Sequence, residues 1–395
     1  MLITINLVAS REWYEARSMP TKEWISTEEA AARLGVKAET LYAYVSRGIV
    51  TRRLADSGKG SEFARREIER LALTRGSRPG RRGAFDVTVA TRVSSIDGDQ
   101  LFFRGVPIAE LVAASTFEDT ADLVWDGADG PWPTAPTTRV TGIHKFRGPD
   151  RMRIVVAHDA ARSPARTATN PPLVRATARS LIVSVASSVG DGAPTSVASI
   201  LAGAGADAKL IRLFDIALLT MADHEMATST LAARVAASTR AGAHDVILAG
   251  LGTLAGPLHG SAGRLAHDLF VRAATVGVDE AVEETIRNGQ RLPGLGHQVY
   301  RSADPRTQPM LDALYSVISP QKRRLISDLL SAMTARVPKL ANCDLALGAM
   351  SFALDRSPDL AEIIFSAARM AGWVAHAIEE YDEQPLRYRG RAISL

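Results

Sequence analysis

The sequence predicts an all-α protein preceded by a small basic domain, and three observations lead to this prediction. Aromatic residues make up only 6% of the 395 residues, while alanine and leucine recur in long runs, which favours packed helices over a β-sandwich. After residue 103, most segments carry apolar residues at helical spacing. A single hairpin signal precedes them at Val93–Phe103, where Asp97-Gly98 separates two apolar runs.

Helical periodicity is clearest in six segments of the main body. They are Ile108–Ala114, Thr116–Trp125, Pro172–Ser188, Ala208–Leu219, His244–Leu254 and Arg264–Val276. Because helices rich in alanine and glycine can approach one another closely, we expect a large helical domain with few strands.

The composition excludes several classes of protein. One cysteine, Cys343, rules out a disulfide framework and any multi-thiolate metal site, and it indicates a reducing compartment. The apolar start, Met1–Ala9, is too short to span a membrane and lacks the basic lead of a secretion signal. We therefore expect a soluble cytoplasmic protein. The sequence has no dinucleotide glycine motif, P-loop or zinc helix, so it favours chemistry without a cofactor or metal.

Positive charge is concentrated near the amino end. Residues 1–83 contain 16 Lys/Arg against 10 Asp/Glu, an excess of six, whereas the whole chain carries +4. Such a segment suits a module that binds a polyanion, and it equally suits a solvated arm. Residues 75–83, rich in glycine and arginine, predict a linker between a domain at residues 1–74 and a body at residues 84–395.

The amino-terminal domain has the pattern of two short helices around a glycine turn. Ser26 and Glu29 are spaced as in a capping box, Gly35 ends the first helix, and a second helix begins at Thr40. We expect a basic hairpin next and then a third helix over Ser61–Leu73, which together make a winged helix-turn-helix.

Residues 24–73 resemble the DNA-binding domains of the MerR and excisionase type. The resemblance directs Lys37, Thr40 and Tyr44 to the major groove, and it places Arg47, Arg52, Arg53 and Lys59 on phosphates. A small helical domain that binds another protein is the alternative left open.

Two segments of the body each carry a histidine in a glycine-rich setting. Gly256–Gly263 places His259 beside a helix N-terminus, where the positive helix end disfavours imidazolium. A neutral ring can donate a hydrogen bond to a carbonyl that gains negative charge. Leu292–Arg301 has two glycines before His297, and Arg306 follows within reach of the same anion.

Two further residues complete the candidate site. Asp344 lies at the start of a helix, where a carboxylate stays ionised and suits a general base. Arg369 lies in the helix Ala361–Tyr381 with no acid three or four residues away, so a buried Arg369 needs an anion from elsewhere. Each residue taken alone is more commonly structural, as a helix cap, a core histidine or a solvated arginine.

Together with Ser95–Gly98, Asp223–Glu225 and Arg389–Ala392, these motifs resemble the citrate synthase family over about residues 91–391. The resemblance implies a homodimer of mostly helical subunits, each with a large domain and a small domain inserted at about residues 205–305. It implies condensation of acetyl-CoA with oxaloacetate, a step of the tricarboxylic acid cycle, with a coenzyme A thioester as substrate and no cofactor.

The same resemblance implies a role for each site residue. Asp344 would remove a methyl proton from the acetyl group, His259 would hydrogen-bond the enolate, and His297 would protonate the ketone oxygen of the oxo acid. Oxaloacetate would be held by His224, Arg306 and Arg369, and by Arg389 of the partner subunit. Coenzyme A would be contacted by Gly294, Leu295, Gly296, Arg301 and Lys339.

Two departures from the family pattern keep other functions open. Ala227 and Gly263 stand where the family carries asparagines, so the oxo acid could be one other than oxaloacetate. One alternative is a 2-methylcitrate synthase that acts on propionyl-CoA. Another is a regulator whose body senses a metabolite while residues 1–74 bind DNA. The retained acid–base residues favour the enzyme.

Overall fold

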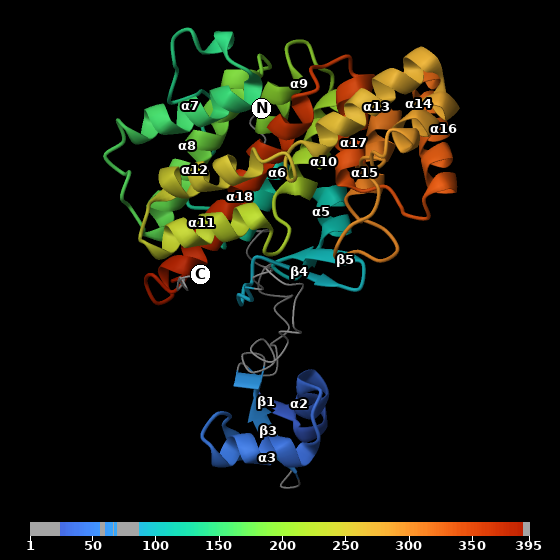
Figure 1. Cartoon of the computed structure of the whole chain (residues 1–395). Coiled ribbons are helices and arrows are strands. Elements are labelled where there is room, and N and C mark those ends of the chain that lie inside the picture. Colours follow the sequence, from blue (N-terminus) through green and yellow to red (C-terminus); the bar gives the residue numbers. More distant parts are fainter. Residues whose placement is uncertain (1–23, 56–59, 66, 69–86, 390–395) are drawn as a thin grey trace, which may run out of the picture. The chain divides into compact units, whose positions relative to one another are not determined.

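The computed structural model describes residues 24–55, 60–65, 67–68 and 87–389, and it divides into two compact units. The first unit is Met1–Ala90 and the second is Thr91–Leu395. Figure 1 draws both units as ribbons. Each unit has its own cluster of buried apolar side chains. The expected linker at residues 75–83 and the expected phosphate contact Lys59 lie outside the described residues.

The first unit combines two short helices with a three-stranded sheet. Its elements are β1 (Trp24–Ser26), α2 (Thr27–Leu34), α3 (Ala38–Ser46), β2 (Arg52–Leu54) and β3 (Ser61–Ala64). The strands pair in the order β1-β3-β2, and both pairings are antiparallel. As predicted, Ser26 caps α2 by accepting the Glu29 N–H, and Gly35 ends it at φ 60°.

Two expectations for this unit are wrong. Ser61–Ala64 is a strand rather than the start of a helix, because pairing with both neighbours buries Phe63 at its centre. Residues 67–68 are helical, and residues 69–73 of the expected helix lie outside the described ranges. Tyr44 does not point outward, since it lies three residues after Leu41 and shares the buried face of α3.

The second unit begins with the predicted hairpin. β4 (Ser94–Asp97), β5 (Gln100–Phe103) and β6 (Val106–Pro107) form an antiparallel sheet in that order. Because Asp97 pairs with Gln100, the two-residue turn is Gly98-Asp99, and Gly98 has φ 60°. Leu101 and Phe103 are fully buried and anchor the hairpin in the core.

The rest of the described body is helical, and each of the six predicted segments is a helix whose ends differ by at most two residues. The helices are α5 (Ile108–Ala114), α6 (Phe117–Val124), the 3₁₀ turn η1 (Ile143–Lys145), α7 (Gly148–Ala160), α8 (Pro171–Val189), α9 (Val197–Ala202), α10 (Ala208–Met221), α11 (Thr228–Ser238), α12 (Ala243–Leu254), α13 (Ala262–Val276), α14 (Val278–Arg287), α15 (Thr307–Tyr315), α16 (Pro320–Arg336), α17 (Cys343–Ala353) and α18 (Leu360–Tyr381). None of them is both long and apolar enough to cross a membrane.

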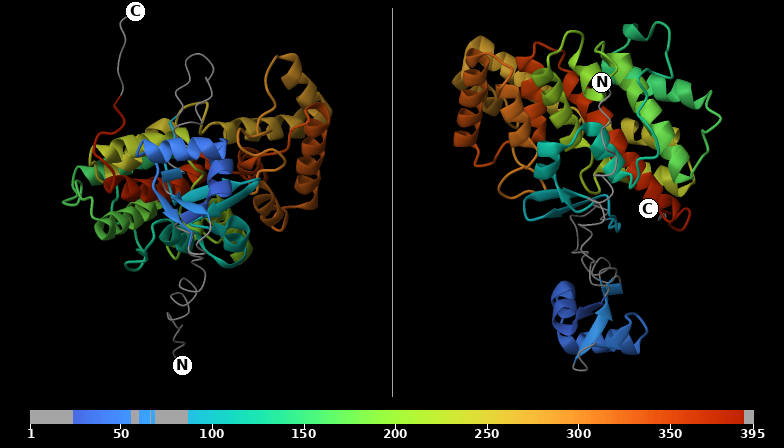
Figure 2. Two further views of the ribbon diagram at one scale, coloured as in Figure 1. Left: turned by 90° about the horizontal axis from the view of Figure 1, so that it is seen from below. Right: turned by 180° about the vertical axis from the view of Figure 1, so that it is seen from behind.

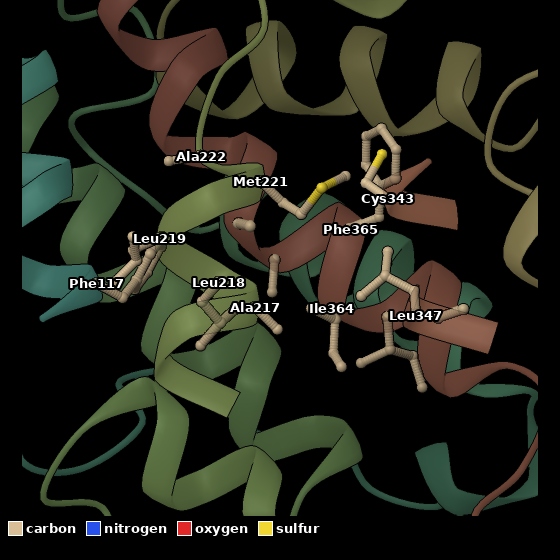
Figure 3. Packing of buried hydrophobic residues seen from close by; sticks show 14 of the residues in the cluster. Phe117, Ala217, Leu218, Leu219, Met221, Ala222, Cys343, Leu347, Ile364 and Phe365 are labelled. Carbon is tan, nitrogen blue, oxygen red and sulfur yellow. The ribbon is translucent and has the colours of Figure 1, made fainter. Parts of the chain in front are cut away.

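The long helix α18 is the centre of the body. All its residues from Ile363 to Ala377 are buried, because it packs on α8, α10, α11 and α12 around its circumference (Figures 1 and 2). Its amino-terminal half also meets α17. Figure 3 shows this part of the core, with Met221 of α10, Cys343 of α17 and Phe365 of α18.

A second group of helices packs mainly with itself. α13 lies against α14, α16 and α17, and α15 also packs on α17. By contrast, α10, α11 and α12 pack on α18. The small domain expected at about residues 205–305 therefore includes helices from both groups, and its boundaries remain a prediction.

Two glycines of α12 give a direct test of this packing. A Cβ on Gly250 would lie 2.4 Å from the ring of the buried Trp373, whereas one on Gly252 would meet nothing within 4 Å. We expect Gly250→Ala to lower the free energy of unfolding by about 1–3 kcal/mol through overpacking. Gly252→Ala should raise it by about 0.5–1 kcal/mol through helix propensity. Equal effects in denaturant unfolding would contradict this packing.

Candidate active site

His259 lies in the turn between α12 and α13, three residues before α13 begins. Its Nε2 lies 2.9 Å from the hydroxyl of Ser229, and its ring meets Phe365 edge-on at a centroid distance of 5.6 Å. Burial, together with the positive charge of Arg369, lowers the pKa of His259 to about 4. The ring is therefore neutral at physiological pH and can serve as a hydrogen-bond donor.

His297 belongs to a cluster of three rings. Its centroid lies 4.9 Å from that of His224 and 4.8 Å from that of Tyr300, and the Tyr300 hydroxyl lies 3.0 Å from His224 Nε2. Burial and the charge of Arg306 lower the pKa of both histidines, that of His224 most strongly. The Val299 N–H donates to His297 Nδ1 at 3.1 Å, which assigns the proton of the neutral ring to Nε2. In this tautomer the Arg306 Nη2, 3.5 Å from Nε2, makes no hydrogen bond to the ring.

Arg306 is held by a buried carboxylate two residues away. Its Nε and Nη2 donate to the two oxygens of Asp304 at 2.9 and 2.8 Å. Burial raises the pKa of Asp304, but the Arg306 charge and hydrogen bonds outweigh it and hold that pKa below its ordinary value. Asp304 also accepts the Cys343 N–H at 3.0 Å, which fixes Arg306 against the first turn of α17.

Asn342 caps α17 and leaves the Asp344 carboxyl group free for other contacts. The Asn342 side-chain oxygen accepts the N–H groups of Asp344 and Leu345, at 3.1 and 3.3 Å. Asp344 is therefore not the helix cap. Burial raises its pKa to about 6; the charges of Arg306 and Arg369 oppose this rise, and that of Asp304 adds to it.

Arg369 is the least satisfied charged group of the candidate site. It is 1% exposed, and its Nε donates to the Met221 carbonyl at 2.9 Å. Its Nη1 and Nη2 are buried and have no hydrogen-bond partner among the described residues. Burial lowers its pKa to about 10, although the negative charge of Asp223 opposes the shift. Because a buried guanidinium is unfavourable without an anion, this geometry points to an anionic ligand.

The electrostatic effects show that these groups share one region of the molecule. The charge of Arg369 lowers the pKa of both His224 and His259. The charge of Arg306 lowers the pKa of His224, His297 and Asp344. The predicted acid–base and anion-binding residues thus lie together, with the exception of Arg389, which is exposed near the carboxyl end.

Four of the five predicted coenzyme A contacts also lie together. The Gly296 N–H donates to the Leu340 carbonyl at 2.8 Å, and the Asn342 N–H donates to the Gly294 carbonyl at 2.9 Å. Gly294 and Gly296 have φ of 74° and 77°, and a Cβ on Gly294 would lie 2.4 Å from that of Leu345. The loop Gly294–Gly296, which includes Leu295, therefore lies against the segment that contains Lys339. Arg301 lies beyond this loop and is exposed.

Sequence analysis missed several residues that the structure places in the site. Asp304-x-Arg306 and His297-x-x-Tyr300 are local spacings, so the roles of Asp304 and Tyr300 could have been proposed from the sequence. The contact between Ser229 and His259 joins residues 30 positions apart and has no local signal. Among the described residues, no three His, Cys, Asp or Glu side chains are grouped so that they could hold a metal ion.

The fold agrees with the comparisons to known proteins. The model of the citrate synthase C-terminal domain matches residues 158–391, so the chain belongs to the citrate synthase family. It is 33% identical to citrate synthase of Synechocystis over 177 residues, which are 43% of this chain and 45% of that protein. It is 24% identical to 2-methylcitrate synthase 2 of Corynebacterium glutamicum over 353 residues, 76% of this chain and 90% of that protein.

The chain spans about half the length of each of the first four curated relatives that it matches. Solved structures cover more. Citrate synthase of Thermoplasma acidophilum, in a ternary complex with carboxymethyl coenzyme A and oxaloacetate, superposes with a TM-score of 0.66 at 23% identity, covering 78% of this chain and 94% of that one. Citrate synthase of Pyrobaculum aerophilum gives 0.65 at 22% identity, covering 78% and 89%. These matches confirm a mostly helical citrate synthase fold.

Arg306 and Arg369, the two buried arginines of the candidate site, should respond in opposite ways to replacement by methionine. Arg306→Met leaves Asp304 buried without its partner, so we expect the free energy of unfolding to fall by about 3–5 kcal/mol. Arg369→Met removes a buried charge that pairs with no carboxylate among the described residues, so the unliganded protein should keep its stability or gain about 1–3 kcal/mol. Chemical denaturation measures both variants. A loss for Arg369→Met as large as that for Arg306→Met would contradict the assignment of Arg369 to a ligand.

Proposed function

We propose that this chain is a citrate synthase-type acyltransferase, which condenses acetyl-CoA with oxaloacetate to give citrate and coenzyme A. The observation that carries the proposal is the buried Arg369 guanidinium, whose Nη1 and Nη2 have no partner among the described residues and lie near Asp344 and the neutral imidazoles of His224 and His259. Planar guanidinium groups bind carboxylates through two hydrogen bonds, and oxaloacetate offers two carboxylates. The coenzyme A thioester is a substrate, and the reaction needs no cofactor.

In the first step, Asp344 removes a methyl proton from the acetyl group. A carboxylate with a pKa of about 6 is too weak a base to make a free enolate, so the thioester oxygen needs a hydrogen-bond donor. His259 supplies it. His259 Nε2 lies 2.9 Å from the Ser229 hydroxyl. In the tautomer that carries its proton on Nδ1, Nε2 accepts from this hydroxyl, and Nδ1–H bonds the thioester oxygen as its negative charge grows.

In the second step, the enolate carbon attacks the ketone carbon of oxaloacetate. His297 donates Nε2–H to the ketone oxygen and transfers this proton as the new carbon–carbon bond forms. Water then hydrolyses the citryl thioester. Oxaloacetate is held by His224, Arg306 and Arg369, and by Arg389 from the partner subunit of a homodimer. Gly294, Leu295, Gly296, Arg301 and Lys339 contact coenzyme A.

The pH dependence follows from the two pKa values near the reacting atoms. Asp344, with a pKa of about 6, must be ionised, and His259, with a pKa of about 4, must be neutral. Both requirements favour higher pH, so activity should rise through about pH 6.

In Asp344→Asn, kcat should fall by about 10²–10⁴-fold. Because burial penalises the Asp344 charge, this variant should be more stable at pH 7 by about 1–3 kcal/mol.

Release of the coenzyme A thiol measures the activity, with Asp328→Asn, an exposed acid on α16, as the control. If the wild-type protein releases no thiol with oxaloacetate or with other 2-oxo acids, the proposal is wrong.

Propionyl-CoA is tested in parallel, because one relative matched over most of its length is a 2-methylcitrate synthase. One methylene group in an apolar pocket changes kcat/KM by about 10–200-fold, so a preference for either donor is measurable.

We infer an additional role for the first unit, which is to bind DNA. Its helix–turn–helix and the β2–β3 hairpin have the outline of a winged helix-turn-helix, and Lys37, Arg47 and Arg52 are exposed on it. Thr40 is half-buried, and Tyr44 belongs to the core. Arg53 donates to Glu62 at 2.9 Å and stacks on Trp24, so it is less available to a phosphate. The two roles are compatible, since the candidate active site lies within the second unit.

A gel-shift titration tests this role with duplex DNA from upstream of the chain's own gene. We expect binding that weakens with salt, and each lost phosphate contact should reduce the log–log salt slope by about 0.9. The triple variant Lys37→Ala, Arg47→Ala, Arg52→Ala should therefore lower the slope by about 2–3. The control changes three exposed basic residues of the body, Lys209→Ala, Arg291→Ala and Arg324→Ala. If the wild-type protein gives no shift at low salt, this role is wrong.

A further inference from the structure

We propose that the β4–β5 hairpin is a clamp with two ends, which sets the spacing between the loops that carry His224 and His297. Ser94 and Asp99 are its positioning residues. The inference rests on the proposed function, because these histidines bind the oxo acid there. The hairpin lies outside residues 158–391, which the family model matches.

Ser94 forms the first end of the clamp. Its hydroxyl donates to Asp223 Oδ2 at 2.5 Å and accepts the Glu225 N–H at 2.9 Å. These two residues flank His224, so one buried hydroxyl holds both sides of the turn. Glu225 has φ 45°, a conformation that a side chain other than glycine seldom adopts without support from its surroundings.

Asp99, in the hairpin turn, forms the second end. Its Oδ1 accepts the Arg301 N–H at 2.7 Å, and its Oδ2 accepts the Ser302 N–H at 2.8 Å and also the Ser302 hydroxyl. Arg301 and Ser302 lie between the ring cluster of His297 and Tyr300 and the Asp304–Arg306 pair. Asp99 therefore fixes the loop at the point that connects the two.

The two clamped loops also contact each other. Tyr300 from one loop lies 3.0 Å from His224 of the other, and the His224 and His297 rings are 4.9 Å apart. The register from Ser94↔Phe103 to Asp97↔Gln100 fixes the distance between the two ends of the clamp. At about 3.3 Å per residue, this rigid span sets how closely the loops approach.

This arrangement predicts a specific defect when either end is removed. A shift of about 1 Å in a binding group can cost up to about 10²-fold in rate, even when the fold is intact. If the clamp positions His224 and His297, loss of either end should therefore raise the KM for oxaloacetate. A hairpin that only stabilises the body should change the thermal midpoint and leave that KM near the wild-type value.

The test compares Ser94→Ala and Asp99→Ala with two matched controls in the same hairpin, Ser95→Ala and Asp97→Ala, whose side chains are exposed. We expect the KM for oxaloacetate to rise about tenfold in each clamp variant, as for loss of a hydrogen bond to a charged group, and to stay within about twofold in the controls. Ser94→Thr, which keeps the hydroxyl, should restore a value near the wild type. The double variant should lose less than the product of the single effects, because both ends fix one spacing.

Three results would overturn the proposal. The first is a KM for oxaloacetate that matches the controls in both clamp variants, and the second is a thermal midpoint that falls with no change in KM. Calorimetric titration with oxaloacetate separates these results from failure of the proposed function. If the wild-type protein binds oxaloacetate but releases no thiol, the synthase reaction is refuted. The clamp then still predicts that Asp99→Ala binds oxaloacetate about tenfold more weakly than the wild-type protein does. The third result is a wild-type protein that does not bind oxaloacetate.

Discussion

A guanidinium group buried without a protein carboxylate is the main physical constraint on this molecule. The body buries several arginines, and the others at this depth each have an acid. Arg179 bonds Asp122 at 2.7 Å, and Arg234 bonds Glu380 at 3.0 Å. Arg306 likewise has Asp304. The Arg369 Nε donates to a backbone carbonyl, and the guanidinium lies over the Phe365 ring, but Nη1 and Nη2 have no hydrogen-bond partner within the described part of the chain.

The protonation states of the site follow from this constraint. Burial lowers the pKa of His224, His259 and His297, and the guanidinium charges add to this effect: Arg306 acts on His224 and His297, and Arg369 acts on His224 and His259. A bound dicarboxylate would offset that positive charge. Its negative charge would raise the pKa of the same histidines. The ligand would thereby tune the acid–base groups that act on it.

Local patterns in the sequence predicted the helices of the body well. The six helical segments, the hairpin, the cap at Ser26 and the unpaired Arg369 all depend on residues within a few positions of one another. Tyr44 was assigned to the wrong face, although its spacing of three from Leu41 was visible. The helix expected from Ser61 is wrong at its start, because Ser61–Ala64 pairs with both β1 and β2 as a strand.

The contacts that the sequence could not predict are those between distant segments. Ser94 and Asp223 are 129 positions apart, and Asp99 and Arg301 are 202 positions apart. No spacing rule links such pairs, because they meet only where segments far apart in the sequence fold against one another. The catalytic candidates were recognisable as motifs, but the residues that position them became visible only in three dimensions.

A crystal structure of the chain with oxaloacetate tests the central claim most directly. The account predicts a carboxylate of the ligand within about 3.2 Å of both Arg369 Nη1 and Nη2, with the ketone oxygen facing His297. A structure in which Arg369 instead pairs with a carboxylate of its own chain, or in which oxaloacetate binds away from it, would contradict the account.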